Sequence, residues 1–407
     1  MKKIFTVIGF LFSICADAQI TFQKTYELNA NEFAMCVQQT SDGGYIMLGR
    51  TSISNNQDIY SVKTNSNGDT VWTKKYGGLW FDNGFYAHEC FDGGYIIAGE
   101  HRITAASSTR IYIVKTNSIG DTLWTKSYYG VFESHAYCVE QTTDSGFVIT
   151  GYTYDSGSYE DVVLLKIDSG GHFQWYKTYG GTNNDVGKSV IQSSDGGFVI
   201  AGYTASFGFA TGAVYLIKTD ITGNLIWSKT YSNLGGSANK VQQTTDGGYI
   251  VCGYDSNDQN LLIKTDAQGN LSWAKTYTGS GSKYHNSALQ TTDGGYIIAG
   301  LNLIKTDNLG TMIWANRFNG SNGIINSVKQ TADGGYIVSG FYYYLSNAKK
   351  FCLIKTNSTG QSGCNESIPT VFSSDAILQE TIVSTAITAL PNSEGYTSTI
   401  VGYGSIV

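Results

Sequence analysis

The chain has 407 residues, of which 41% are hydrophobic and 14% are charged, and its formal net charge is −6. An acidic chain lacks the basic surface that binding to the backbone of a nucleic acid requires, so nucleic acid is excluded as a partner. Only two prolines occur, Pro369 and Pro391. Both lie beyond the repeats described below, so no proline interrupts a strand ladder within them.

Residues 1–18 have the features of a secretory signal. Two lysines precede an apolar stretch over residues 4–14, and an Ala-x-Ala sequence at residues 16–18 marks a cleavage site. Cys15 offers a lipoprotein signal as the alternative, but Ile14 stands where such signals have a small residue. We expect export to a secreted or outer cell-surface location, with no transmembrane segment in the mature chain.

The next segment, residues 19–363, repeats one unit seven times. An Asp-Gly-Gly-Tyr/Phe motif or a close variant recurs at spacings of 50, 52, 51, 51, 47 and 40 residues, and a tryptophan that follows a glycine by four residues keeps step with it. The motif begins at Asp42, Asp92, Asp144, Asp195, Asp246, Asp293 and Asp333, and the tryptophans are Trp72, Trp124, Trp175, Trp227, Trp273 and Trp314. A strand-rich repeat of this length predicts a β-propeller or another closed array.

Each repeat resolves into four short strands, which we name A to D. In the fourth copy they cover residues 189–192, 198–203, 214–218 and 225–231, separated by Asp-, Gly- and Asn-rich turns. We therefore predict an all-β fold, a seven-bladed β-propeller of four-stranded antiparallel blades.

The connections between the strands define two faces. The A–B and C–D connections are short and nearly invariant, whereas the B–C and D–A connections vary in length and composition. Because successive strands alternate in direction, the two kinds of connection lie on opposite faces. We call them the turn face and the loop face.

The seventh copy lacks strand D, since Cys364 falls where its tryptophan is due. Residues 22–26 have the missing pattern, with Phe22 in place of tryptophan. We predict that this N-terminal strand pairs with residues 351–356, completes the last blade and closes the ring. Closure removes the sheet edges that promote aggregation.

The remaining segment, residues 364–407, is rich in Ser and Thr and is interpreted as a linker or as the start of a truncated domain. The cysteines of the mature chain share no repeat position, so we expect structural thiols. Cys352 and Cys364 are the one pair to test as a disulfide, because the C–D hairpin brings them near each other.

Three motifs of the repeat carry a resemblance to a known family. They are exemplified by residues 244–253, 216–224 and 175–181. Together they resemble the secreted β-propeller repeat proteins that type IX systems of Bacteroidota-like bacteria export. The resemblance covers residues 20–363 and implies the propeller and this export route. It implies no activity, and the tail contains no recognisable sorting domain of the kind that members often carry.

Two other propeller families share fragments of the pattern. Residues 220–227 are similar to the tryptophan-docking repeat of quinoprotein propellers, and residues 40–44 resemble the Asp-box of sialidases. In both families these motifs are structural. Sialidase chemistry would need an arginine cluster, but the four arginines occupy no matching repeat positions, and the quinoprotein enzymes have eight blades. We therefore expect no cofactor.

Repetition separates scaffold residues from site residues. We predict that residues present in every copy hold each blade to the next; these are the Asp of the motif, the Trp series and Lys63, Lys115, Lys166, Lys218, Lys264, Lys305 and Lys355. Candidate ligand-binding residues are those that break the symmetry in the variable loops. They are Trp80, Phe81, Asp82, Tyr129, Phe132, Tyr154, Phe207 and Tyr343. Alternatively, these rings cap the ends of the blades.

A second set is acidic. Glu32, Asp82, Glu133 and Asp185 stand just before strand A in the first four blades, where they would ring the mouth of the central channel. The alternative is that they cap strand-entry amides. His88, His135 and His285 come from blades that are not all neighbours, so we expect no metal site.

No catalytic motif nominates a nucleophile or a general base. We therefore predict a secreted or cell-surface, monomeric recognition or scaffold propeller without catalytic activity, which binds a glycan or an extracellular protein on its loop face. The alternative is an exported enzyme that acts on polysaccharide or another extracellular substrate at the channel mouth.

Overall fold

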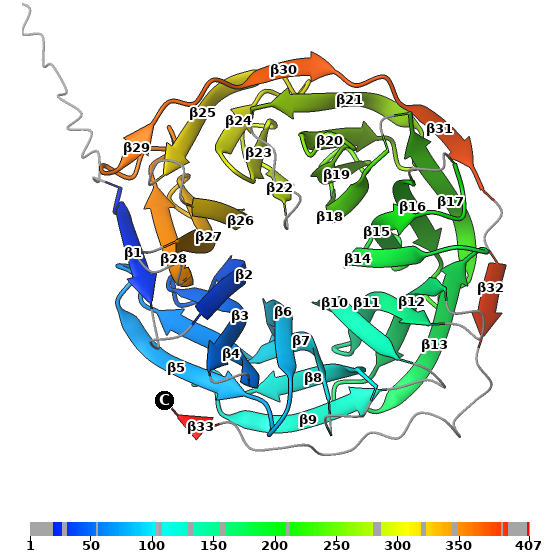
Figure 1. Ribbon diagram of the computed structural model, residues 1–407, viewed down its shortest axis with the longest axis horizontal. Coiled ribbons are helices and arrows are strands. Elements are labelled where there is room, and N and C mark those ends of the chain that lie inside the picture. The colour runs from blue at the N-terminus through cyan, green and yellow to red at the C-terminus, as the bar shows by residue number, and fades with distance from the viewer. Residues whose placement is uncertain are drawn as a thin grey trace, which may run out of the picture.

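The computed structural model describes residues 19–26, 31–53, 56–102, 104, 108–128, 133–154, 159–208, 212–233, 235–279, 286–318, 323–343, 349–383, 386–389 and 405–406. Seven antiparallel sheets stand around a central channel and form a seven-bladed β-propeller, as predicted (Figure 1). Within these ranges no helix is long and apolar enough to span a membrane. The predicted leader, residues 1–18, lies outside them.

Each blade contains strands A to D in order from the channel outward. Blade 1 consists of β2 (Asn31–Gln39), β3 (Tyr45–Ile53), β4 (Asn56–Thr64) and β5 (Thr70–Tyr76). Blade 2 consists of β6 (Asp82–Glu89), β7 (Tyr95–His101), β8 (Arg110–Thr116) and β9 (Thr122–Tyr128). Blade 3 consists of β10 (Ser134–Gln141), β11 (Phe147–Tyr154), β12 (Glu160–Ile167) and β13 (Phe173–Gly180). Blade 4 consists of β14 (Asp185–Gln192), β15 (Phe198–Thr204), β16 (Ala213–Thr219) and β17 (Leu225–Ser232).

The other three blades follow the same plan. Blade 5 consists of β18 (Ser237–Gln243), β19 (Tyr249–Tyr254), β20 (Asn260–Thr265) and β21 (Leu271–Thr278). Blade 6 consists of β22 (Ser287–Gln290), β23 (Tyr296–Ala299), β24 (Leu303–Thr306) and β25 (Met312–Phe318). Blade 7 consists of β26 (Gly323–Gln330), β27 (Tyr336–Tyr343), β28 (Lys349–Thr356) and β1 (Phe22–Tyr26).

The N-terminal strand closes the ring, which confirms the prediction. β1 pairs antiparallel with β28, so that Phe22 lies opposite Lys355 and Tyr26 lies opposite Phe351. The Phe22 ring also packs against Tyr45 of blade 1 at 6.2 Å. The first and last described parts of the propeller therefore stabilise each other.

Tryptophans hold neighbouring blades together, as predicted. Trp72 of blade 1 packs against Tyr95 of blade 2 with ring centroids 5.9 Å apart. The same contact recurs, at 5.6–6.4 Å, in Trp124–Phe147, Trp175–Phe198, Trp227–Tyr249, Trp273–Tyr296 and Trp314–Tyr336. Phe22 thus stands at the tryptophan position of the repeat and makes the equivalent contact, with Tyr45 of blade 1.

The Asp–Lys series does not hold blades together, so that part of the prediction is wrong. Lys63 on strand C lies 2.8 Å from Asp42 in the A–B turn of its own blade, and the Lys63 side chain is only 3% exposed. The lysine reaches this turn because strand C ends on the turn face, next to strand B. Six equivalent pairs lock the A–B turns of the other blades.

A hydrogen bond that the sequence analysis missed joins all seven interfaces. In each, the backbone amide just before the motif aspartate donates to a Gln or Glu on strand A of the next blade, at 2.8–3.0 Å. The pairs are Ser41–Glu89, Phe91–Gln141, Thr143–Gln192, Ser194–Gln243, Thr245–Gln290, Thr292–Gln330 and Ala332–Gln39. The last pair joins blade 7 to blade 1.

The tail runs around the outside of the ring and adds a fifth strand to five blades (Figure 1). Its strands are β29 (Glu366–Ser367), β30 (Phe372–Asp375), β31 (Gln379–Ile382), β32 (Ala386–Ala389) and β33 (Ser405–Ile406). They pair with the outer strands of blades 6, 5, 4, 3 and 1 respectively. The sequence analysis did not predict this belt.

The described cysteines are free thiols, so the candidate pair Cys352 and Cys364 is not joined. Cys352 lies on β28 with its side chain in the core between blades 6 and 7, and it is fully buried. Cys364 is exposed.

Candidate functional site

A β-bulge in strand A shapes the central channel. In β10 the pairing register shifts between Ala136 and Cys138, so Tyr137 is an extra residue without a partner on β11. Such a bulge re-aims side chains, and here both Tyr137 and Cys138 line the channel pocket. Equivalent shifts occur in β2, β6, β14, β18 and β26.

The channel pocket has a volume of about 330 Å³ and two chemically different sides. Blades 1 to 3 contribute apolar, aromatic and thiol groups, from Met35, Cys36, Phe85, Tyr86, Tyr137 and Cys138. Blades 5 to 7 contribute amides and hydroxyls, from Asn239, Asn286, Ser287, Asn326 and Ser327. Three lysines, Lys188, Lys240 and Lys329, complete the lining.

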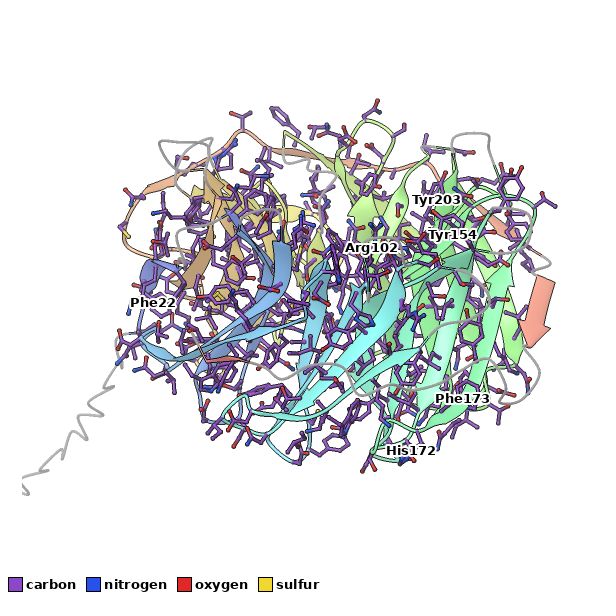
Figure 2. The ribbon with its side chains drawn as sticks, turned by 60° about the horizontal axis from the view of Figure 1, so that its bottom comes forward. Phe22, Arg102, Tyr154, His172, Phe173 and Tyr203 are labelled. Carbon is purple, nitrogen blue, oxygen red and sulfur yellow. The ribbon has the colours of Figure 1, made fainter. Side chains whose placement is uncertain are left out.

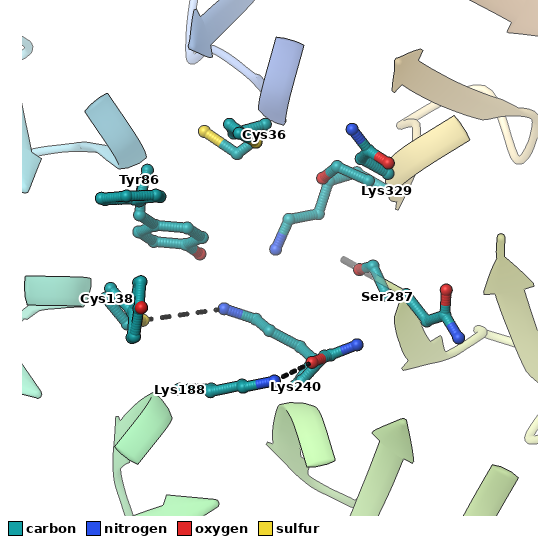
Figure 3. A pocket seen from close by; sticks show the side chains of 14 residues that line it. Cys36, Tyr86, Cys138, Lys188, Lys240, Ser287 and Lys329 are labelled. Atoms are coloured by element: carbon teal, nitrogen blue, oxygen red, sulfur yellow. Dashed lines mark hydrogen bonds between the residues drawn. The ribbon is translucent and has the colours of Figure 1, made fainter. Parts of the chain in front are cut away.

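The three lysines point into the channel (Figure 3). Lys188 Nζ donates to Asn239 Oδ1 at 3.2 Å, and burial lowers the pKa of Lys188 to about 8. Lys240 Nζ lies 4.1 Å from the centre of the Tyr86 ring and 3.9 Å from Cys138 Sγ. Burial and the neighbouring charge of Lys240 lower the pKa of Lys329.

A second cluster lies on the loop-face side of blades 2 and 3; we call Glu100, His135, Tyr137, Tyr152, Tyr154 and Glu160 the loop-face cluster. His135 Nδ1 contacts the Glu100 carboxylate, and the imidazole stacks on Tyr152 with centroids 4.3 Å apart and an interplanar angle of 11°. The Tyr152 ring lies 5.8 Å from that of Tyr154, whose hydroxyl donates to Glu160 at 3.2 Å.

The loop-face cluster continues into the channel. Tyr137 lies 5.8 Å from Tyr152 and 5.0 Å from Phe85, and both Tyr137 and Phe85 line the channel pocket. Burial raises the pKa of Glu160, although its hydrogen bond with Tyr154 opposes this. Figure 2 shows Tyr154 on the upper side of the ring, opposite His172 and Phe173 of a C–D turn.

The predicted ligand-binding residues are dispersed. Trp80 is 42% exposed, and Phe81 is half-buried beneath the Arg102 guanidinium at 5.6 Å. Phe207 packs against Tyr215 at 5.8 Å, as expected of a ring that caps a blade. Of the predicted residues whose side chains the structure describes, only Tyr154 joins the loop-face cluster.

The other predicted aromatic residues lie outside the described part of the chain. This applies to Tyr129 and Phe132 entirely and to the side chain of Tyr343, whose backbone belongs to β27. Their binding role stays a prediction.

The four acidic residues are mostly buried. Glu32, Asp82 and Asp185 are 0–1% exposed, and Glu133 is half-buried. Asp82 and Asp185 accept hydrogen bonds from backbone amides four residues earlier, at 2.7 and 2.9 Å, as strand-entry caps would. Burial raises the pKa of Asp82 to about 7. Among the described residues, no three His, Cys, Asp or Glu side chains are placed to hold a metal ion.

Sequence reasoning missed the channel lysines and most of the loop-face cluster. Lys188 and Lys240 stand seven and six residues before their motif aspartates, positions whose residue type changes from blade to blade. That variation was the available signal. This variation points to a site only once the bulge is known, because the bulge turns the positions of Lys188 and Lys240 toward the axis of the propeller.

The sequence matches no protein-family model and no curated protein. Among solved structures, the chain is similar to Chaetomium thermophilum Sqt1 bound to the N-terminus of a ribosomal protein, with 8% identity, 81% of this chain and 98% of that chain covered and a TM-score of 0.49. It is also similar to a mutant of NanB sialidase from Streptococcus pneumoniae, with 11% identity, 83% and 70% covered and a TM-score of 0.46. BBS1N in complex with ARL6DN gives 11% identity, 84% and 98% covered and a TM-score of 0.47.

Proposed function

We propose that this chain is an exported, monomeric recognition propeller that binds a glycan on its loop face and catalyses no reaction. The observation that carries the proposal is the loop-face cluster, in which aromatic rings stand beside carboxylates and an imidazole. Export rests on the leader at residues 1–18 and on the repeats that resemble type IX cargo.

The cluster has the chemistry that a sugar requires. Tyr152 and Tyr154 are half-buried, so part of each ring faces solvent and offers an apolar surface to the C–H groups of a sugar ring. Glu160 is also half-buried, and its carboxylate accepts hydrogen bonds from hydroxyl groups. The stacking of His135 on Tyr152 fixes the ring orientation in advance, which reduces the entropic cost of binding.

Glycan-panel binding by the purified protein tests the proposal. We expect retention of at least one bacterial or plant polysaccharide, lost in Tyr154→Ala and partly kept in Tyr154→Phe, which preserves the ring but not the hydrogen bond to Glu160. Phe91→Ala is the matched control, because Phe91 is 72% exposed in an A–B turn on the opposite face. Trp80→Ala reports whether the neighbouring loop contributes.

Two results would overturn the glycan assignment. Failure to bind any polysaccharide would leave an extracellular protein as the ligand of the same surface. Equal loss in Tyr154→Ala and Phe91→Ala would place binding elsewhere.

A specific observation supports the enzyme alternative. Glu160 has a raised pKa, as a general acid requires, and it shares a cluster with His135 and Glu100. Release of shorter sugars by the wild type, abolished in Glu160→Gln while binding persists, would assign a hydrolase in place of a binding protein.

A further inference from the structure

We propose that the central channel is a binding site for a small organic carboxylate. The site adjoins the loop-face cluster, with which it shares Tyr137, but the proposal does not rest on glycan binding. The site is enclosed by strand A residues of different blades and lies at the propeller axis (Figure 3).

The channel pocket carries an excess of positive charge. Three ammonium groups, those of Lys188, Lys240 and Lys329, point into one pocket. The other titratable groups around them are Cys36, Tyr86, His88, Tyr137, Cys138 and Glu140. Among these Glu140 is the one carboxylate, and it is shared with His88 at 3.7 Å. A cluster of half-buried cations with one carboxylate is short of negative charge, which a bound anion supplies.

Polar groups of the pocket lining lack hydrogen-bond partners. Figure 3 marks no hydrogen bond from Lys329 to another residue of the pocket lining. Asn239 Nδ2 is buried and has no partner, while Asn239 Oδ1 already accepts from Lys188. Asn239 Nδ2 is an unsatisfied donor that a carboxylate, which only accepts, can satisfy. Asn286 Oδ1 and Asn326 Oδ1 of the same lining are unsatisfied acceptors.

The size and lining of the pocket suit a small organic molecule. A pocket of about 330 Å³ is at the lower end of the range for small-molecule sites, roughly 300–1,000 Å³. Its opposite side presents Met35, Phe85 and Tyr86, an apolar surface that an inorganic anion would leave uncovered. An organic acid places its carboxylate among the lysines and its carbon skeleton against these rings.

Thermal unfolding of the purified protein tests this proposal. Acetate, benzoate and glucuronate are titrated at constant ionic strength, with chloride and inorganic phosphate as reference anions. We expect at least one of the carboxylates to raise the Tm saturably, beyond the effect of chloride and phosphate. Lys329→Met should weaken that binding by at least about tenfold, because it removes a half-buried charged partner. Without ligand, the Tm of Lys329→Met should equal or exceed that of the wild type, because the repulsion from Lys240 is gone.

Lys177→Met is the matched control. Lys177 lies on the outer strand β13, where its Nζ donates to Asn224, so this variant removes one positive charge away from the channel and should keep the wild-type response. Asn239→Ala serves as the second channel variant if Lys329→Met fails to fold, and it should also weaken binding.

Three outcomes would overturn the proposal. They are no stabilisation by any of the three carboxylates, equal stabilisation of the wild type and the channel variant, and stabilisation by phosphate alone. The last would indicate a site for an inorganic anion.

Discussion

Gly151 lies so close to the carbonyl oxygen of His135 that a Cβ atom at Gly151 would stand 1.9 Å from this oxygen. The two residues face each other across the bulge of blade 3, where Gly151 pairs with Ala136. The same glycine stands opposite the bulge in five other blades, with the corresponding distance between 1.8 and 2.0 Å. The repeated Gly of strand B is therefore required by the bulge that shapes the channel.

Gly151→Ala should destabilise the protein by about 3 kcal/mol, because the backbone of β10 must move to admit the methyl group. Denaturant unfolding measures this change. Gly78→Ala is the control, since no atom lies within 4 Å of a Cβ built at Gly78, and it should change the free energy of unfolding by less than about 0.5 kcal/mol. Similar values for the two variants would contradict the role of the close contact.

The tail offers two acidic residues that differ mainly in burial. Glu380 on β31 pairs with Lys229 at 2.5 Å and accepts a hydrogen bond from the Leu271 amide at 2.6 Å, so it joins blades 4 and 5. The Lys229 side chain is 4% exposed. Asp375 on β30 also pairs with a lysine, Lys275, but the Asp375 side chain is 82% exposed.

Glu380→Gln should therefore lower the free energy of unfolding by about 1–3 kcal/mol, since a buried ammonium loses its counter-charge. Asp375→Asn should have an effect below about 1 kcal/mol, because solvent screens an exposed pair. Parallel thermal or denaturant unfolding compares them. The reverse order would mean that the belt does not pack as the structure shows.

Removal of residues 366–407 should promote self-association. Without the belt, the outer strands of blades 3 to 6 present unpaired backbone groups, which are templates for pairing with another chain. Light scattering after size exclusion should detect species larger than the full-length protein. A truncated chain with the same mass distribution as the full-length protein would argue against this protective role.

The fold could be predicted from the sequence because the seven copies show the same strands and turns, and because the seventh copy alone lacks strand D. The lining of the channel could not be predicted in the same way. One extra residue on strand A changes the direction of the side chains only through the pairing of strand A with strand B, which the sequence does not show. The tail pattern at residues 379–382 suits a strand, yet its partner β17 lies about 150 residues earlier and shares no motif with it. Likewise, repetition identified Asp42 and Lys63 as structural without revealing that their contact stays within one blade.

Two aspartates should give the protein opposite responses to pH. Asp82 is 1% exposed, and burial raises its pKa to about 7; the Gly78 amide opposes this shift and Asp58 adds to it. Burial alone would raise the pKa of Asp42 as well. Hydrogen bonds from Lys63, Thr40 and the Gly44 amide outweigh burial and lower this pKa to about 2. In an unfolded chain both groups titrate near pH 3.9.

Between about pH 4 and pH 7 the folded protein binds more protons at Asp82 than the unfolded chain does, so this group makes stability fall as pH rises. Asp82→Asn should therefore be more stable than the wild type at pH 8, by up to about 4 kcal/mol, and equal to it below about pH 4. The asparagine Oδ1 still accepts the hydrogen bond from Gly78. His101 lies 3.9 Å from Asp82, and burial lowers its pKa to about 4, so its imidazole is neutral over most of this pH range.

Asp42→Asn should behave in the opposite way. The folded-state pKa of Asp42 is depressed, so its stabilising contribution is present above about pH 4 and is lost as pH falls toward 2. This variant should be less stable than the wild type at neutral pH, and the difference should shrink in acid. Free energies of unfolding measured from pH 3 to pH 8 for the three proteins test both signs. Parallel curves would show that neither carboxylate has the shifted pKa that its surroundings imply.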